Sequence, residues 1–567
     1  MSSLDALKNA SNLRDFATAI GYRPQGLTYI LYKIPDASKY TTFEIPKRSG
    51  GFRPIAAPTW QLKALQRRLA DVLYECRDEI DAAAKRKSLS HGFRRKHSII
   101  TNATRHKGRR FVFNLDIEDY FPSFNFGRVR GFFIRNRHFG LHPSAATLIA
   151  QIACFENQLP QGSPCSPVIA DLISHLLDVK LAQLAKQHGA TYSRYADDLT
   201  FSTRKKDFPG AIARTANAGV DWEIGNRLIS AITEAGFRIN ENKTRMQLST
   251  SRQLVTGLTV NAKVNITSTY YRRARHMCHS LFRTGLYYDK DELAAEFGPE
   301  VITDLAPLEG ILSHIHHVKD AVDRRDAKAK VAEATAARRL YKSFLSYRNF
   351  VRLERPLVVC EGKTDNVYLK CAIRHLPAFH PKLGSIVDGK FVSAVAFFNY
   401  LNQSHKILQL SGGSDTLKNF AIHYQTMLKD FRHRPLLHPV VLLVDNDEGA
   451  KDLFLAMRSK FKRTISRDTT DAFYHLTDNL YLVKTIERGD GATSCIEDCF
   501  APQLLATQLD GKKFNPEKDF GSDGEYGKHV FSDKVVRAQA NTVDFSGFVP
   551  LLQRLVAVVD DYAIRRN

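Results

Sequence analysis

Cysteine is scarce in this sequence, with 8 among 567 residues, and all are scattered singly except Cys495 and Cys499. No pair of Cys-x-x-Cys knuckles occurs, which excludes a zinc ribbon and a disulfide-stapled scaffold. Long apolar runs are missing as well. Residues 1–22 contain Asp5, Lys8 and Arg14 without an apolar run, which excludes a normal signal peptide, and no later stretch approaches a membrane span. We therefore expect a cytoplasmic protein that has no membrane partner.

Acidic residues are also in deficit, because 59 Asp and Glu face 82 Lys and Arg, which gives a formal net charge of +23. Such an excess favours a polyanionic partner, above all nucleic acid, over an acidic membrane surface. Charge alone names no reaction, and a merely basic housekeeping protein is the alternative at this point. The sequence shows no internal repeat, low-complexity tract or long disordered tail.

The length of the chain is too great for one ordinary core, and two or three cores are expected. Between about residues 27 and 345, short β-rich runs such as residues 110–116 mix with amphipathic helices such as residues 61–76, which indicates an α+β body. Residues 315–350 are rich in Ala, Lys and Arg, and we expect a connecting helix there. A domain boundary near Arg355-Pro356 follows.

Strand and helix alternate beyond that boundary. The predicted strands are residues 357–360 and 439–444, and the predicted helices are residues 364–373 and 450–461. Alternation of this kind predicts an α/β body with a mainly parallel sheet.

Adjacent aspartates are the sharpest sign of chemistry. Tyr195-Ala196-Asp197-Asp198 lies between polar and β-prone residues, a layout suited to a hairpin turn. A lone Asp-Asp pair is usually a solvated turn, but neighbouring carboxylates are tolerated where divalent cations neutralise them. A second apolar strand carries Asp116 near its end, and three carboxylates suit two Mg2+ ions roughly 3.5 to 4 Å apart for phosphoryl transfer. Ile117 is counted with Asp116, Asp197 and Asp198 as a predicted metal contact.

Two further elements lie between these acids in the chain. Phe121 follows Asp116 by five residues, where a bulky ring would clash with a ribose 2'-hydroxyl and select deoxynucleotides. Ordinary core packing is the alternative for this ring. Residues 159–167 form a loop rich in Gly and Pro, and its unusual path suits close contact of a nucleotide with Gln161 and Gly162.

In this order, Asp116 with Phe121, the Gln161-Gly162 loop and the Tyr-Ala-Asp-Asp turn resemble the palm motifs of reverse transcriptases. The resemblance implies an α+β right-hand polymerase with fingers, palm and thumb that uses deoxynucleoside triphosphates. It also implies roles for three basic residues. Arg53 and, second to it, Lys47 would clasp the incoming triphosphate, and Lys243 near the leaving pyrophosphate would act as a general acid. Taken singly, each of these is more ordinarily a surface charge.

Two short elements narrow the family to retron reverse transcriptases. Asn102 and His106 match the NAxxH element of these enzymes, and Val255-Thr256-Gly257 matches their VTG element. The resemblance implies that the enzyme recognises its own non-coding RNA, primes from an internal guanosine 2'-hydroxyl and makes branched RNA–DNA, termed msDNA. Both elements are expected to contact the RNA. Further RNA contacts are expected from the basic, tyrosine-bearing stretch that holds Arg272, Arg273 and Arg275.

Acids also follow the predicted strands of the α/β body. Glu361 ends the first strand where a helix begins, and Asp445 and Asp447 end the second. Strand ends host chemistry in α/β sheets, although a lone Asp-x-Asp is mostly structural. With Ser411-Gly412-Gly413 between them, these acids resemble a Toprim domain, the metal-binding module of topoisomerases, bacterial primases and overcoming-lysogenisation-defect nucleases. By this resemblance Glu361 is the catalytic acid/base, and one or two Mg2+ are bound by Glu361, Asp365, Asp445 and Asp447.

A weaker similarity lies further on. Glu497-Asp498 and residues 526–531 look like the tail of those nucleases, whose lysine offsets charge on the scissile phosphate. Lys528 is the candidate, and an exposed lysine is the ordinary alternative. No topoisomerase tyrosine domain is recognisable, so hydrolysis is favoured over strand passage.

These predictions combine into a fused enzyme. We expect an N-terminal region and fingers in residues 1–105, a palm in 106–262, a thumb and helical connector in 263–350, and a Toprim-like nuclease domain in 351–567. The expected activities are RNA-directed DNA polymerase and an Mg2+-dependent nuclease that acts as an antiphage toxin effector. The expected partners are the cognate RNA, msDNA, dNTPs and the nucleic-acid target of the nuclease, and a homo-oligomer is left open.

Two rivals remain at this stage. One is a general bacterial reverse transcriptase that uses ordinary primers, and the other is a nucleic-acid-binding scaffold with a non-catalytic Toprim domain. Asp171 departs from the retron pattern, because the family usually has Asn soon after the Gly-Pro loop. The departure leaves the predicted metal ligands intact but changes the local hydrogen bonding.

Overall fold

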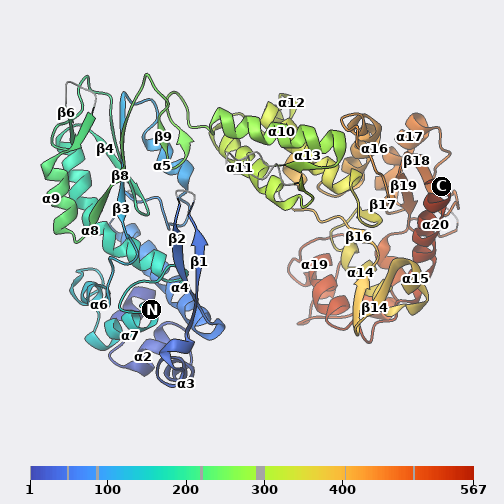
Figure 1. Cartoon of the computed structure of the whole chain (residues 1–567). Coiled ribbons are helices and arrows are strands. Elements are labelled where there is room, and N and C mark those ends of the chain that lie inside the picture. The colour runs from blue at the N-terminus through green and yellow to red at the C-terminus, as the bar shows by residue number, and fades with distance from the viewer. Residues whose placement is uncertain are drawn as a thin grey trace. The chain divides into compact units, whose positions relative to one another are not determined.

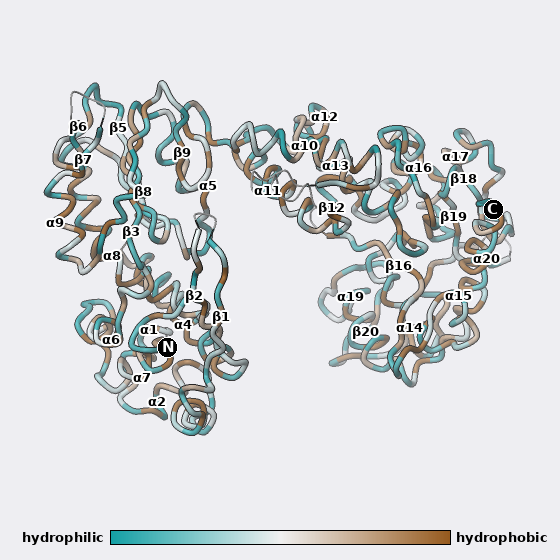
Figure 2. Tube along the Cα trace, viewed as in Figure 1, coloured by the Kyte–Doolittle hydropathy of each residue, from teal (hydrophilic) through white to brown (hydrophobic). Residues whose placement is uncertain are grey.

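The computed structural model describes residues 2–47, 50–84, 88–216, 221–288, 301–401, 404–489 and 492–566. The chain divides into two compact units (Figure 1): Met1–Ser268 with Val318–Asp323 form unit 1, and Thr269–His317 with Arg324–Asn567 form unit 2. Hydrophobic and hydrophilic residues are interleaved along the trace (Figure 2), and no described helix is long and apolar enough to cross a membrane.

Unit 1 combines helices with a central antiparallel sheet and short hairpins. Its helices are α1 (Ser3–Lys8), α2 (Leu13–Ala19), α3 (Pro24–Thr28), α4 (Trp60–Ala83), α5 (Ile99–Arg105), α6 (Phe126–Arg135), α7 (Pro143–Ala153), α8 (Ser166–Gln187) and α9 (Asn226–Glu234). Its strands are β1 (Tyr40–Pro46), β2 (Phe52–Pro58), β3 (Phe111–Glu118), β4 (Thr191–Tyr195), β5 (Asp198–Thr203), β6 (Ala213–Ala216), β7 (Asp221–Ile224), β8 (Arg238–Leu248), β9 (Leu254–Val255) and β10 (Leu258–Thr259).

The central sheet of unit 1 has the order β4-β5-β3-β8, and every neighbouring pair is antiparallel. Its inner strand β3 is almost entirely buried up to Ile117, which its apolar sequence explains. Register places Asp116 opposite Asp198 on β5 and opposite Asn240 on β8. The strand therefore carries Asp116 to the end of the sheet where β4 turns into β5.

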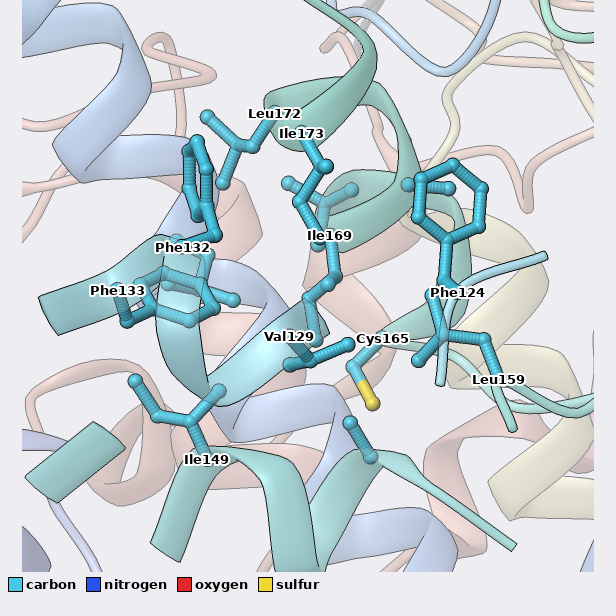
Figure 3. Packing of buried hydrophobic residues seen from close by; sticks show 14 of the residues in the cluster. Phe124, Val129, Phe132, Phe133, Ile149, Leu159, Cys165, Ile169, Leu172 and Ile173 are labelled. Carbon is cyan, nitrogen blue, oxygen red and sulfur yellow. The ribbon is translucent and has the colours of Figure 1, made fainter. Parts of the chain in front are cut away.

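Helices α6, α7 and α8 build a core in unit 1. Figure 3 shows Phe133 of α6, Ile149 of α7 and Ile169 of α8 gathered in this core, together with Cys165 from the loop before α8. Helix α8 has a proline in its first turn, where the missing N–H has no helical partner to lose. The loop that precedes α8 is thus anchored by buried residues on both sides.

Unit 2 contains a helical part followed by an α/β part. Its helices are α10 (Ser268–Thr284), α11 (Ala306–Val322), α12 (Ala327–Ala332), α13 (Ala336–Ser346), α14 (Asp365–His375), α15 (His380–Leu383), α16 (Ser414–Leu428), α17 (Lys451–Phe461), α18 (Pro502–Leu505), α19 (Lys528–Val530) and α20 (Val549–Arg566). The last residues of α11, from Val318 on, are counted with unit 1. Its strands are β11 (Tyr287–Tyr288), β12 (Val301–Ile302), β13 (Leu357–Cys360), β14 (Gly384–Val387), β15 (Lys390–Ser393), β16 (Ala396–Phe397), β17 (Val440–Val444), β18 (Tyr474–Thr477), β19 (Leu480–Lys484), β20 (Lys513–Phe514) and β21 (Glu525–Tyr526).

The main sheet of unit 2 has the order β16-β13-β17-β19-β18. Strands β16, β13, β17 and β19 pair in parallel, and β18 adds an antiparallel edge. All five residues of β17 are buried, as expected for a strand covered on both faces. Because β13 and β17 are parallel neighbours, the residues that follow them, Glu361 and Asp445, meet at one edge of the sheet.

The connecting region differs from the predicted single helix over residues 315–350. Three α-helices and most of a π-helix (Tyr347–Val351) occupy it, because Asp326 and Thr335 cap new helices at α12 and α13 through side-chain hydrogen bonds to backbone N–H groups. Helix α10, predicted as part of the thumb, packs within unit 2. The ring of Phe282 lies 5.1 Å from that of Phe431, and its carbonyl oxygen accepts hydrogen bonds from the backbone of residues 432 and 433.

Candidate functional site

The hairpin between β4 and β5 presents the two adjacent aspartates. Tyr195 pairs with Asp198, so Ala196 and Asp197 form a two-residue turn. Ala196 has a φ of +57°, in the left-handed region that residues other than glycine seldom adopt. The backbone N–H of Ile117 donates to the carbonyl oxygen of Asp197 at 3.0 Å, which ties the turn to the end of β3.

Asp116 joins the same end of the sheet from β3. Its side chain is almost buried, and Lys243 Nζ on β8 lies 2.9 Å from its Oδ2 atom. Asn240 donates a longer hydrogen bond of 3.4 Å to the same oxygen. The structure therefore brings Asp116 and Lys243 to the adjacent Asp197 and Asp198, from which both are far apart in the sequence.

Crowding of the carboxylates raises the pKa of Asp197 and of Asp198. Burial and the charge of Asp116 raise the pKa of Asp197, and burial together with repulsion from Asp197 and Asp116 raises the pKa of Asp198 to about 7. Lys243 opposes both shifts. A cluster of hard oxygen donors that repel one another suits Mg2+, so the donor set fits this ion in kind.

The loop before α8 lies against strand β2 of the β1-β2 hairpin. The backbone N–H of Ala56 donates to the carbonyl oxygen of Gln161 at 2.9 Å. Gly162 has a φ of +121°, and a Cβ atom there would lie 2.6 Å from the carbonyl oxygen of Ala56. Only glycine fits this contact. The same hairpin carries Arg53 and Lys47, both exposed. Burial keeps the pKa of Asp197 raised, and the charge of Arg53 offsets a small part of that rise.

Phe121 is half-buried beside two other rings. Its ring centroid lies 5.4 Å from that of Tyr120 and 5.9 Å from that of Phe93. The ring is therefore held in place while part of it stays accessible, and its role in excluding a 2'-hydroxyl stays a prediction.

The NAxxH residues lie inside the protein, and contact between these two side chains and RNA stays a prediction. Asn102 and His106 have no exposed surface. Ser193 donates to Asn102 Oδ1 at 2.6 Å, and His106 lies 2.7 Å from both Ser193 and Ser202 through its two ring nitrogens. Burial lowers the pKa of His106 to about 3, so the ring is neutral at pH 7. These residues brace β4 and β5, because Ser193 and Ser202 belong to those strands.

The VTG residues form the turn between β9 and β10. Thr256 and Gly257 have φ values of +47° and +80°, which suits a tight hairpin. Thr256 donates to the carbonyl oxygen of Ile99, the first residue of α5, at 3.3 Å. Val255 has no exposed surface, whereas Gly257 is exposed, and contact of the VTG residues with RNA stays a prediction. The NAxxH helix and the VTG turn are thus neighbours in the fold.

The predicted RNA-binding arginines lie on α10. Arg272 and Arg275 are exposed and Arg273 is partly buried. Contact between these side chains and RNA stays a prediction.

Asp171 is buried in α8 and makes ion pairs with Arg77 and Arg194. This explains the departure from Asn, since a carboxylate is needed to balance two guanidinium groups. Arg194 was missed as a functional candidate. The only available signal was its position directly before the Tyr-Ala-Asp-Asp turn.

A second acidic cluster lies where β13 and β17 end. Glu361 accepts hydrogen bonds from the backbone N–H of Ser414 at 3.0 Å and of Asp445 at 3.1 Å. Asp445 in turn accepts from the backbone of Ile496 at 3.0 Å. Gly412 has a φ of +91°, and a Cβ atom there would lie 2.8 Å from the carbonyl oxygen of Glu361. The glycine loop thus passes close to the acid.

The other predicted acids of this cluster are also held by backbone. Asp365 accepts from Gly362 N–H at 2.7 Å, and Asp447 accepts from Ala450 N–H at 3.1 Å. Burial and the charge of Glu497 raise the pKa of Asp365 to about 7, and burial with Asp365 and Glu361 raises that of Asp445 to about 9. Burial and mutual repulsion therefore favour the protonated form of Asp365 and Asp445 in this cluster.

Lys528 enters this cluster through Glu497. Its Nζ atom lies 3.0 Å from Glu497 Oε1, and although burial opposes protonation, Glu497 raises the pKa of the lysine to about 12. Glu497 is almost fully buried and repels both Asp365 and Asp445. The sequence pointed to Glu497-Asp498 without giving either a role, so the place of Glu497 beside the acids is a result of the structure.

Within the described ranges, no group of three or more His, Cys, Asp and Glu side chains is arranged so that it could bind a metal ion. In unit 1, Lys243 forms an ion pair with one oxygen of Asp116. In unit 2, backbone N–H groups donate hydrogen bonds to side-chain oxygens of all four predicted ligands. Both predicted sets of Mg2+ ligands, including Ile117, therefore stay predictions.

Comparison with known proteins bears on unit 1. The family described as "Reverse transcriptase (RNA-dependent DNA polymerase)" matches residues 45–260. Retron Mx65 reverse transcriptase of Myxococcus xanthus is 34% identical over 313 residues, which cover 52% of this chain and 65% of that protein. Retron Mx162 reverse transcriptase of the same organism is 34% identical, with 46% of this chain and 55% of that protein covered. The chain thus spans less than two thirds of these two relatives.

Solved structures show a weaker likeness. A telomerase from Candida albicans in complex with a TWJ fragment of telomeric RNA is 10% identical, with 58% of this chain and 66% of that chain covered at a TM-score of 0.31. A likeness this low carries no weight for the fold.

Retron Ec86 reverse transcriptase of Escherichia coli is 32% identical over 273 residues, which cover 48% of this chain and 78% of that protein. With this identity over most of a curated relative, the chain belongs to the retron reverse transcriptase family.

Proposed function

We propose that unit 1 is an RNA-directed DNA polymerase that copies the retron's own non-coding RNA into branched RNA–DNA. The observation that carries the proposal is the convergence of three carboxylates, with Asp116 opposite Asp198 and bonded by Lys243 at 2.9 Å. Membership of the retron family supports the choice of a polymerase over a scaffold.

The roles of the side chains follow from where they lie. Asp116, Asp197 and Asp198 would hold Mg2+, which when bound supplies charge neutralisation for in-line phosphoryl transfer. Lys243 donates a proton toward the leaving pyrophosphate from beside Asp116. The exposed cations of the β1-β2 hairpin bind the triphosphate, and Phe121 excludes the 2'-hydroxyl.

Sequencing of the nucleic acid that co-purifies with the full chain tests this function. A 2',5'-branched RNA–DNA product supports retron synthesis, and a linear copy supports a general reverse transcriptase that uses ordinary primers. Bound nucleic acid without synthesis or cleavage would instead support the scaffold. Supplying the purified chain with its cognate RNA and dNTPs repeats the test in vitro.

We propose a second function for the α/β part of unit 2, namely Mg2+-dependent phosphodiester hydrolysis by a Toprim-like site. The supporting observation is the gathering of Glu361, Asp365 and Asp445 at the ends of parallel strands, with Lys528 beside them. Strand ends are the usual location of chemistry in such sheets. Lys528 offsets charge on the scissile phosphate when Glu497 releases it.

Cleavage of labelled DNA and RNA by the full chain, with and without Mg2+, tests the second function. Glu361→Gln should abolish cleavage, because the group that exchanges a proton is lost. Asp452→Asn, an exposed acid on α17, is the matched control and should cleave normally. Cleavage that persists in Glu361→Gln would contradict the assignment.

We further propose that the branched product restrains the nuclease until phage infection disturbs it, so that unit 2 acts as an antiphage effector. The motivation is the presence of both sites in one chain. Host growth with and without intact branched DNA tests the idea, and equal growth with an intact Glu361 site would contradict it.

A further inference from the structure

Four charged side chains lie behind the Tyr195–Asp198 hairpin with almost no contact with water. Arg194, Asp171 and Asp178 are fully buried and Arg77 is 5% exposed. Arg194 Nη2 donates to Asp171 at 2.7 Å and to Asp178 at 2.7 Å, and its Nε donates to Asp178 at 2.7 Å. Arg77 forms an ion pair with Asp171. Two guanidinium groups and two carboxylates therefore balance in charge.

The remaining nitrogen of Arg194 reaches the hairpin turn. Its Nη1 donates to the carbonyl oxygen of Ala196 at 3.1 Å and to the hydroxyl of Tyr120 at 3.0 Å. Ala196 is the residue with a φ of +57°. A left-handed alanine persists only where its surroundings hold it, and Arg194 supplies such a contact.

The backbone of Arg194 is held as well, by residues 88–92. Its N–H donates to the carbonyl oxygen of Leu89 at 3.0 Å, and its own carbonyl oxygen accepts from His91 at 2.7 Å. Gly92 lies directly against the turn, because a Cβ atom there would be 2.5 Å from the nitrogen of Ala196 and 3.1 Å from the carbonyl carbon of Tyr195. Any larger residue at position 92 would displace the turn.

The charges of the cluster support one another. Burial by itself would lower the pKa of Arg194, but Asp178, Tyr120 and Asp171 raise it well above its usual range. Burial would raise the pKa of Asp171, but Arg77 and Arg194 lower it. Arg194 and Asp171 therefore support each other as an ion pair, and removal of either one leaves an uncompensated buried charge.

We propose that Arg194 is a positioning residue, which fixes the Ala196-Asp197 turn through its grip on the carbonyl oxygen of Ala196. Asp171 and Asp178 hold its guanidinium group, and residues 88–92 hold its backbone. The role rests on the proposed polymerase activity. Because Arg194 acts through the turn and touches no reacting group, it affects the rate of the chemical step and leaves nucleotide affinity nearly unchanged.

Two variants of the full chain test this role. Arg194→Lys keeps the charge, but one ammonium group cannot reproduce the fork that reaches both aspartates and Ala196. Gly92→Ala leaves the charged cluster intact and pushes on the turn directly. In primer extension, each should lower kcat by about 10- to 100-fold, with KM for the dNTP within about threefold. Hydrogen exchange should rise in residues 88–92 and 193–198 and stay unchanged in unit 2.

Tyr192→Phe is the matched control. This variant removes a buried hydroxyl that donates to Asp178 at 2.8 Å. Within the described residues, the hydroxyl itself makes no hydrogen bond to the Ala196-Asp197 turn. Its kcat should stay within about twofold of that of the wild type.

Wild-type kcat and wild-type exchange over residues 193–198 in Gly92→Ala and in folded Arg194→Lys would overturn the proposal. If Arg194→Lys does not fold, Gly92→Ala decides alone. Failure of the polymerase assignment is distinct, because the wild type itself would then make no DNA. In that case the exchange measurement still tests whether Arg194 holds the turn.

Discussion

The two acidic clusters of this protein use positive charge differently. In unit 1 the exposed Lys243 contacts Asp116, while the buried cations, Arg77 and Arg194, lie behind the Ala196-Asp197 turn and pair with Asp171 and Asp178. In unit 2, Lys528 lies among the acids themselves, beside Glu497. Buried charge therefore shapes the backbone in the first cluster, whereas it offsets mutual repulsion of the acids in the second. Removal of a buried cation should therefore alter the geometry of the Ala196-Asp197 turn in unit 1. Removal of Lys528 should lower the free energy of unfolding of unit 2.

The largest expected effect concerns the turn of unit 1. Asp197→Asn should lower primer extension at least about 1000-fold, which corresponds to ~4 kcal/mol of transition-state stabilisation, because one charged ligand of the proposed Mg2+ site is lost. Cleavage by unit 2 should be unchanged. Asp221→Asn, an exposed acid in the same unit, is the control. Full extension by Asp197→Asn would remove the polymerase assignment.

The mirror experiment concerns Glu361. Glu361→Gln should lower nucleic-acid cleavage at least about 100-fold, since a positioned proton-exchanging group is removed. Primer extension should stay within about twofold, because Glu361 belongs to a different compact unit. A parallel loss of both activities would mean that the two clusters do not act as separate sites.

The next prediction concerns the free energy of unfolding of unit 2, to which the Lys528–Glu497 pair should contribute. Lys528→Met leaves Glu497, which is 1% exposed, without its partner. We expect the free energy of unfolding of unit 2 to fall by about 3 kcal/mol, the cost of an unpaired buried charge. Adding Glu497→Gln should recover most of it. Urea unfolding followed by a probe in unit 2 measures the free energy of unfolding of the wild type, of Lys528→Met and of the double variant. If Lys528→Met is as stable as the wild type, the Lys528–Glu497 pair does not contribute to stability.

The buried histidine of unit 1 gives a pH dependence. Burial lowers the pKa of His106 to about 3 in the folded protein, against roughly 6.5 when unfolded. The unfolded state therefore binds the proton first, so this stability is complete above about pH 6.5 and is lost as the pH falls toward 3. At pH 5 the loss is about 2 kcal/mol.

His106→Gln should reduce this slope in urea unfolding of unit 1 at pH 7 and pH 5. His91, whose pKa is also lowered to about 3 by burial, stays in the variant and keeps part of the slope. An unchanged slope would mean that His106 is not buried and neutral.

The smallest expected effect concerns the hydrogen bond that joins Thr256 of the VTG turn to Ile99 of the NAxxH helix α5. Thr256→Ala removes the hydrogen bond to the carbonyl oxygen of Ile99 and should lower the free energy of unfolding of unit 1 by about 0.5 to 1 kcal/mol. Thr256→Ser keeps the hydroxyl and serves as the control. Equal stability of both variants would show that the bond contributes nothing.

Much of the secondary structure is predictable from local patterns. The predicted strand over residues 357–360 is β13, and the predicted helix over residues 450–461 begins one residue later as α17. Apolar runs and helical periodicity specify such elements within the segment itself. The connector over residues 315–350 was predicted as one helix because its capping residues, Asp326 and Thr335, carry a weaker signal than its composition.

The sequence by itself pointed to Asp116 in one cluster and to Glu361 and Asp445 in the other, because an acid at the end of an apolar run is visible without any fold. Only the tertiary structure decided what the neighbouring polar residues do. Asn102 and His106 are predicted RNA contacts, yet they brace β4 and β5 from within, and Arg194, to which the sequence assigns no role, is buried. The physical reason is that burial and ion pairing depend on segments distant in the chain, such as α4 and α8, which no local pattern near these residues contains.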